Sequence, residues 1–153
     1  TVMVFTIVAG SIIYSQLLSY SGISRVITNT ILDLPLSPSG TLLLMMIIVL
    51  ILGTLMDQVA IIMIAVPIFY PIISSLGFDP FWFGVLMLIN LEIGLTTPPF
   101  GMLLFVVKGV TSEDVSMVEL YKSAFPFILC DLCSMLLIIL FPSLTLWLPN
   151  IST

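Results

Sequence analysis

The sequence predicts an all-α membrane protein, built as a bundle of transmembrane helices. Of its 153 residues, 60% are hydrophobic and only 7% are charged, and the mean hydropathy is +1.34. A water-soluble fold cannot bury that much apolar surface. At about 20 residues per crossing, a chain of this length accommodates four or five spans joined by short loops.

Charge and residue usage exclude several classes of function. Three basic and eight acidic residues give a net charge of -5, and the absence of a basic run excludes nucleic acid as a partner. The sequence has no histidine, which removes the commonest general base and metal ligand. An intramembrane enzyme is disfavoured because the sequence also shows no nucleophile and base pair.

The first two predicted elements are a span over residues 1–20 and a short interfacial helix with its loop over residues 23–39. Val2–Leu18 is apolar apart from four polar side chains, which suits a spanning helix. Residues 23–39 carry Arg25 and Asp33 between apolar residues near helical spacing. Since the chain opens inside the first apolar run, we expect it to be a piece of a longer polypeptide.

Residues 41–75 are predicted to form a re-entrant helical hairpin. Leu42–Ile73 comprises 32 nearly uninterrupted apolar residues, and as one helix it would measure about 48 Å against a hydrocarbon core of about 30 Å. Its polar interruption, Gly53–Gln58, follows an arm of 11 apolar residues, which is about half a bilayer. A full crossing followed by an interfacial helix is the competing interpretation.

A discontinuous helix is predicted over residues 81–109. Phe81–Ile93 opens with an aromatic anchor and should be helical, and Met102–Val107 should resume the helix. Between them, Gly94–Gly101 contains two consecutive prolines, which remove two amide donors and push the preceding residue out of the α region. At membrane depth such a break survives only where protein buries it or where it lines a polar cavity.

The last predicted span covers residues 121–148 and follows a polar loop. Lys108 and Lys122 flank that loop, whereas Arg25 is the single basic residue expected on the opposite side of the membrane. Because cytoplasmic loops carry an excess of lysine and arginine, the loop is predicted to be cytoplasmic.

Two interruptions at similar depth point to a transporter site built from discontinuous helices. Carbonyl oxygens freed at the interruptions, together with the hydroxyls of Thr54, Thr96 and Thr97, suit a small cation. The N-termini of half helices suit a carboxylate. This combination fits cation-coupled anion transport better than catalysis.

Three acidic residues within the membrane segments are further candidates, because such residues are costly unless they face the interior of the bundle. For Asp57 there are two alternatives: it takes part in ion binding or gating, or it makes a structural hydrogen bond at the hairpin tip. Glu92 is expected to brace the break, and Asp131 to make a packing or interfacial contact.

An ordered series of short motifs resembles the large membrane subunit, DctM-like, of the tripartite ATP-independent periplasmic (TRAP) transporters. Each motif alone would be weak, but the order along nearly the whole chain matches the C-terminal half of that subunit. The motifs are Gly53–Asp57, Pro67–Pro71, Leu76–Pro80, Phe83–Val85, Asn90–Gly94, Thr97–Gly101 and Phe141–Pro149.

The resemblance implies a sodium-driven, elevator-type transporter in the bacterial inner membrane. Such a transporter takes an organic acid anion, a dicarboxylate or a sugar acid, from a soluble periplasmic binding protein and works with a small membrane subunit. Two inverted repeats each supply a hairpin and a broken helix. This chain would hold the second of them, and the N-terminal half of the permease would supply the first.

The resemblance also implies a site. Sodium would be bound by residues of the tip and of the break, several through backbone oxygens, with the substrate beside them. The alternative is a non-transporting membrane assembly or scaffold subunit, which has no need for paired breaks that carry threonine and aspartate. The sodium ligands are Gly53, Thr54, Asp57, Gly94, Thr96, Thr97 and Pro98, and the substrate-binding residues are Thr54, Thr97 and Pro98.

Overall fold

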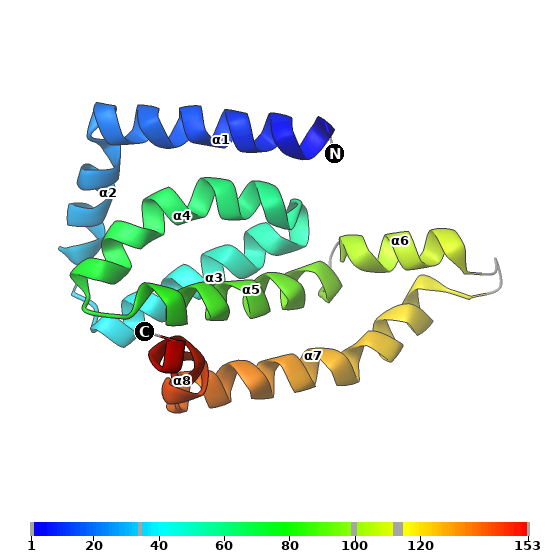
Figure 1. Cartoon of the computed structure of the whole chain (residues 1–153). Helices are drawn as coiled ribbons and strands as arrows, with labels where there is room; N and C mark the ends of the chain where they lie inside the picture. The colour runs from blue at the N-terminus through cyan, green and yellow to red at the C-terminus, as the bar shows by residue number, and fades with distance from the viewer. Residues whose placement is uncertain (1, 34, 99–100, 112–114, 153) are drawn as a thin grey trace.

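The computed structural model describes residues 2–33, 35–98, 101–111 and 115–152, and the regular structure of this part is entirely helical (Figure 1). The all-α prediction is therefore confirmed. The helices are α1 (Val2–Ser21), α2 (Ile23–Leu32), α3 (Pro38–Leu55), α4 (Gln58–Ser75), α5 (Pro80–Thr96), α6 (Met102–Val110), α7 (Met117–Leu140) and α8 (Ser143–Ser152).

Helices α1 and α2 correspond to the first span and the interfacial helix predicted from the sequence. They meet at Gly22, whose φ of 71° is a left-handed conformation that favours glycine. The chain turns sharply there, and both helices pack against α4 (Figure 1).

Helices α3 and α4 run antiparallel and form a helical hairpin (Figure 1). The hydroxyl of Ser37 caps α3 by accepting from the amide of Gly40 at 3.2 Å, and Pro38 occupies the first turn, where a missing amide hydrogen costs nothing. The turn between the arms consists of Met56 and Asp57 alone, which makes the interruption shorter than the predicted Gly53–Gln58.

The arms of the hairpin are longer than the sequence arithmetic assumed. Each has 18 residues and so measures about 27 Å, close to the full hydrocarbon thickness rather than half of it. The first arm, α3, starts at Pro38, earlier than the predicted Leu42, and Gly53 and Thr54 are still helical at its other end. The structure therefore establishes a helical hairpin with two arms of equal length.

Helices α5 and α6 are the two halves of the predicted broken helix. Asp79 caps α5 by accepting from the amides of Phe81 and Trp82 at 2.8 and 3.0 Å. The first half extends to Thr96, one turn beyond the predicted Ile93, so that Gly94 and Thr96 are helical. The helix ends there because Thr97 precedes a proline. Pro99 and Phe100 lie outside the described residues.

The last span differs from the prediction at both ends. Helix α7 begins at Met117 because Ser116 and Glu119 form a capping box, in which each side chain bonds the other residue's backbone amide. It ends at Leu140, so residues 121–148 do not form one helix. Phe141 leaves the helical region with φ -127° and ψ 76°, as expected for a residue that precedes a proline, and α8 follows.

The buried core lies between α3, α4 and α5. Its innermost side chains, which include Val49, Ile72 and Leu86, have no exposed surface. The indole of Trp82 donates from Nε1 to the carbonyl oxygen of Ile138 at 2.9 Å and ties α5 to α7.

Three of the described helices, α3, α4 and α7, are long and apolar enough to cross a membrane, and α5 is a shorter apolar helix. Helix α7 exposes large apolar side chains along its length, such as Phe127 and Leu140. Such a surface is unsuited to water and fits lipid or other membrane segments. The chain is a multi-pass membrane protein.

Candidate functional site

The structure packs the end of α3, beside the hairpin tip, against the end of α5, beside the helix break. Gly53, near the end of α3, packs backbone to backbone on Gly94, near the end of α5. A Cβ atom built on Gly94 would lie 2.9 Å from both the Cα and the carbonyl carbon of Gly53. A Cβ atom built on Gly53 would lie 3.3 Å from the Cα of Gly94. A side chain at position 94 would collide with the backbone of Gly53, so this close approach requires glycine there, and the contact at position 53 is tight as well.

The threonine hydroxyls of the predicted site all donate to carbonyls of their own helices. Thr54 donates to the carbonyl oxygen of Ile51 at 2.8 Å, and both Thr96 and Thr97 donate to that of Ile93, at 3.1 and 2.5 Å. A hydroxyl that has used its one hydrogen in this way keeps its oxygen lone pairs for another partner. The arrangement therefore leaves these oxygens able to act as ligands for a cation.

Asp57 has a structural role at the tip. Its carboxylate accepts from the backbone amide of Val59 at 3.0 Å and so caps the N-terminus of α4. This is the structural hydrogen bond that the sequence analysis left open. Its participation in ion binding stays a prediction.

The break after α5 directs backbone oxygens toward Gly101. This glycine is buried and has a φ of 55°, a left-handed conformation that favours glycine. A Cβ atom built on it would lie 3.5 Å from the carbonyl oxygens of both Leu95 and Thr97. Two carbonyl oxygens thus lie close to a position whose backbone conformation favours glycine. The sequence analysis did not single out Gly101 as a site residue, although a glycine directly after Thr-Pro-Pro-Phe marks a backbone that needs unusual angles.

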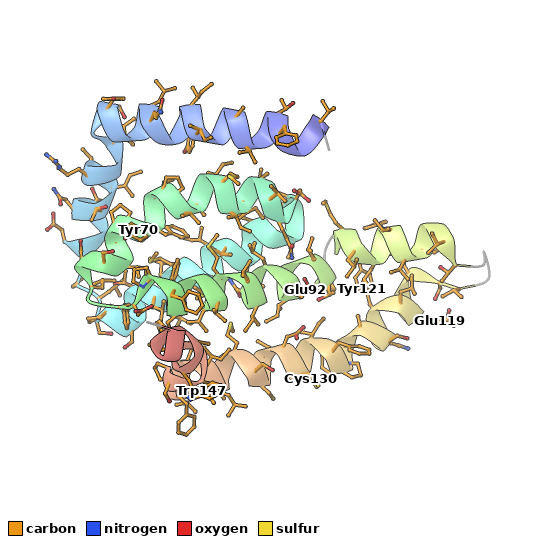
Figure 2. The ribbon with its side chains drawn as sticks, in the orientation of Figure 1. Tyr70, Glu92, Glu119, Tyr121, Cys130 and Trp147 are labelled. Carbon is orange, nitrogen blue, oxygen red and sulfur yellow. The ribbon has the colours of Figure 1, made fainter. Side chains whose placement is uncertain are left out.

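Helix α7 covers the other side of the break. The ring of Tyr121 lies 3.3 Å from a Cβ atom built on Gly101, and Figure 2 shows Tyr121 and Glu92 close to the break. A pocket of about 450 Å³ separates α5, α6 and α7 here. Two of the three intramembrane acids share it. Its polar lining residues are Glu92, Thr96, Ser123 and Asp131.

Carbonyl and hydroxyl oxygens are the commonest possible cation ligands in this region. Among the described residues, no group of three or more histidine, cysteine, aspartate or glutamate side chains could hold a metal ion. Neutral oxygen ligands of this kind suit a hard monovalent cation, in contrast to the nitrogen and sulfur ligands that zinc or copper prefer.

The comparison with known families decides which class of membrane protein this is. Residues 1–144 match the model of the "Tripartite ATP-independent periplasmic transporter, DctM component". The chain belongs to the DctM family. The resemblance read from its motifs is thereby confirmed.

Curated DctM relatives align over nearly the whole chain. The C4-dicarboxylate TRAP transporter large permease protein DctM of Pseudomonas aeruginosa is 37% identical over 150 residues, which cover 98% of this chain and 35% of that protein. The sialic acid TRAP transporter large permease protein SiaM of Vibrio cholerae is 31% identical over 151 residues, 99% of this chain and 35% of that protein. The 2,3-diketo-L-gulonate TRAP transporter large permease protein YiaN of Escherichia coli is 30% identical over 141 residues, 92% of this chain and 32% of that protein.

The chain spans about a third of the length of these DctM relatives. The relatives are permeases, a class of transporters rather than of enzymes.

Proposed function

We propose that this chain forms part of a sodium-coupled secondary transporter that carries an organic acid anion across the bacterial inner membrane. The observation that carries the proposal is the backbone contact of Gly53 with Gly94, which places the tip of a hairpin against the end of a broken helix. Paired discontinuous elements of this kind are how transporters build ion and substrate sites at the bilayer midplane.

The oxygen atoms at this contact supply the proposed sodium ligands. Thr54, Thr96 and Thr97, whose hydroxyl oxygens keep lone pairs, lie at or directly after the C-terminal ends of α3 and α5, where helix carbonyls also lack amide partners within the helix. Helix C-terminal carbonyls carry partial negative charge, which favours a cation. The proposed ligands are Gly53, Thr54, Asp57, Gly94, Thr96, Thr97 and Pro98.

The N-terminus of α6 is the better of two candidates for the substrate carboxylate. Helix N-termini attract anions, but Asp57 already caps the N-terminus of α4 with its own carboxylate. The N-cap of α6 is Gly101, which has no side chain to compete with an anion. Thr97 and Pro98 precede it in the break, and with Thr54 they complete the proposed substrate site.

The names of the relatives support an organic acid as the substrate. C4-dicarboxylate, sialic acid and 2,3-diketo-L-gulonate are the compounds named for three of them, and all three carry a carboxylate. For this chain we propose a dicarboxylate or a sugar acid. A soluble periplasmic binding protein would deliver this substrate to the permease. Transport would also require a small membrane subunit and the remaining part of the permease.

We further propose that the α3–α4 hairpin is re-entrant and moves as part of an elevator-type transport unit. In the full permease, single cysteines at Ser39 and Ser75 should then react with an impermeant maleimide from the same, periplasmic, face. A cysteine at Val115, in the loop before α7, should react only from the cytoplasmic face. Labelling of positions 39 and 75 from opposite faces would show that the hairpin is instead a full crossing followed by an interfacial helix.

Sodium coupling is tested at Thr97. Replacing Thr97 by valine keeps the β-branched shape and removes the hydroxyl. If that oxygen binds sodium, the loss of a buried polar contact should cost about 1–3 kcal/mol, or roughly 5- to 150-fold in sodium affinity. The measurement is uptake by the complete transporter in proteoliposomes, with the half-saturating sodium concentration read for each variant.

Two further variants control this experiment. Thr96→Val removes the neighbouring hydroxyl, and we expect the smaller effect there because adjacent residues rarely point the same way. Thr30→Val removes a hydroxyl with the same kind of bond, from Thr30 to the carbonyl of Val26 at 2.8 Å, far along the chain in α2, and should change nothing. Uptake by the parent protein that ignores sodium would overturn the coupling, as the scaffold alternative predicts.

A further inference from the structure

Helix α5 holds a buried amide inside an apolar interface. Asn90 is 2% exposed, and its Nδ2 atom donates to the carbonyl oxygen of Met46 in α3 at 2.6 Å. A buried amide among apolar side chains costs free energy unless it is hydrogen-bonded. The bond therefore fixes one rotation and one height of α3 against α5, about one turn before Gly94 along α5 and about two turns before Gly53 along α3.

A second side-chain bond joins α5 to the other arm of the hairpin. Gln58, the first residue of α4, donates from Nε2 to the Oε2 atom of Glu92 at 3.1 Å. Residues 90 and 92 are separated by about 200° around the helix axis, which is why one side chain reaches α3 and the other reaches α4. Helix α5 is thus held by both arms of the hairpin.

The two side-chain hydrogen bonds lie close to the hairpin tip and the helix break. Gln58 directly follows the two-residue tip, and Glu92 lies about one turn before Thr96, the last residue of α5. The Gln58–Glu92 bond consequently spans from the tip to the break without involving any of the proposed sodium ligands. It is placed to set the distance between the two groups of oxygen atoms.

We propose that Glu92 is a positioning residue for the cation site, which acts through its hydrogen bond to Gln58. This inference rests on the proposed function, because it names what holds the tip and the break at binding distance. Without the bond, the two discontinuities sample wider separations, and an ion must first order them. The apparent affinity for sodium is then the intrinsic affinity multiplied by the fraction of molecules that have the binding geometry.

The bond can be removed from either side, and its chemistry permits a conservative replacement. Glu92→Gln keeps one acceptor oxygen that can face Gln58, while it replaces the charged carboxylate by a neutral amide of the same shape. Gln58→Ala and Glu92→Ala each remove the bond. Gln16 lies exposed on α1 and is the other glutamine of the chain, so Gln16→Ala controls for the loss of a helical glutamine.

The experiment measures the half-saturating sodium concentration and the maximal rate of uptake by the complete transporter in proteoliposomes. We expect Gln58→Ala and Glu92→Ala to raise the half-saturating concentration by a similar factor, about 3- to 10-fold. The double variant should be no worse than either single one, because both remove the same contact. Glu92→Gln and Gln16→Ala should stay within about twofold of the parent, the scatter expected of an unperturbed site.

Each contrary outcome has a separate meaning. If Glu92→Gln is as impaired as Glu92→Ala while Gln58→Ala is normal, the charge of Glu92 acts directly and the positioning role is wrong. If both alanine variants lower only the maximal rate and leave the sodium dependence unchanged, the bond is merely structural and the inference fails. If uptake by the parent itself ignores sodium, it is the proposed function that fails, and the inference falls with it.

Discussion

Replacing Gly94 by alanine tests whether the backbone contact between α3 and α5 holds the site together. The added Cβ atom would lie 2.9 Å from two backbone atoms of Gly53, and since carbon atoms pack at about 3.5 Å or more, the helices must separate by at least about 0.5 Å. Backbone atoms cannot turn aside as a flexible side chain does. Overpacking of this kind costs about 1–3 kcal/mol, against a gain of about 0.5–1 kcal/mol for alanine over glycine in a helix.

The same helix provides the matched control for this change. A Cβ atom on Gly84 meets nothing within 4 Å, so Gly84→Ala gains helix propensity without a clash. Gly53→Ala, with its nearest contact at 3.3 Å, should fall between the two. We therefore expect the apparent unfolding temperature of the purified full-length permease to decrease in the order Gly84→Ala, Gly53→Ala, Gly94→Ala. If Gly94→Ala is as stable as Gly84→Ala, the contact is not tight and the reasoning is refuted.

Three other contacts yield predictions for the same full-length protein. Gly101→Ala should lower transport more than stability, because a left-handed alanine costs about 1–2 kcal/mol and its methyl group enters the space beside two carbonyl oxygens; normal uptake kinetics would contradict this. Ser116→Ala should lower the stability of the protein by about 1 kcal/mol, because it removes the N-cap of α7. Ser116→Thr and Ser116→Asp keep a capping oxygen and should retain the unfolding temperature of the parent. If all three variants unfold at the same temperature, the capping box does not stabilise the helix. Trp82→Phe should lower the unfolding temperature by removing the indole hydrogen bond to the carbonyl of Ile138, about 1 kcal/mol plus packing; an unchanged temperature would argue against this tie between α5 and α7.

Local signals in the sequence predicted where helices are interrupted, but they placed the boundaries less well. The sequence predicts that Gly53 and Gly94 lie in the interruptions, whereas both are helical. Glycine weakens a helix by only about 1 kcal/mol, and close packing readily compensates for it. Proline removes an amide donor and disfavours the α region for the residue before it, and α5 and α7 end at Thr96 and Leu140, each two residues before a proline. Proline alone does not decide the end of a helix, however, because Pro67 and Pro71 lie inside α4 and Pro126 lies inside α7.

The sequence by itself determined the class of the protein, the order of its elements and the two discontinuities, because composition, apolar run length and proline act locally along the chain. Only the tertiary structure decided which residues face one another across the site. Helices α3, α4 and α5 are apolar on all sides, so they have no polar face to reveal which side packs inward. The contacts of Gly53 with Gly94, of Gln58 with Glu92 and of Asn90 with Met46 join residues more than thirty positions apart. They depend on the rotation of each helix, which the packing of the whole bundle sets.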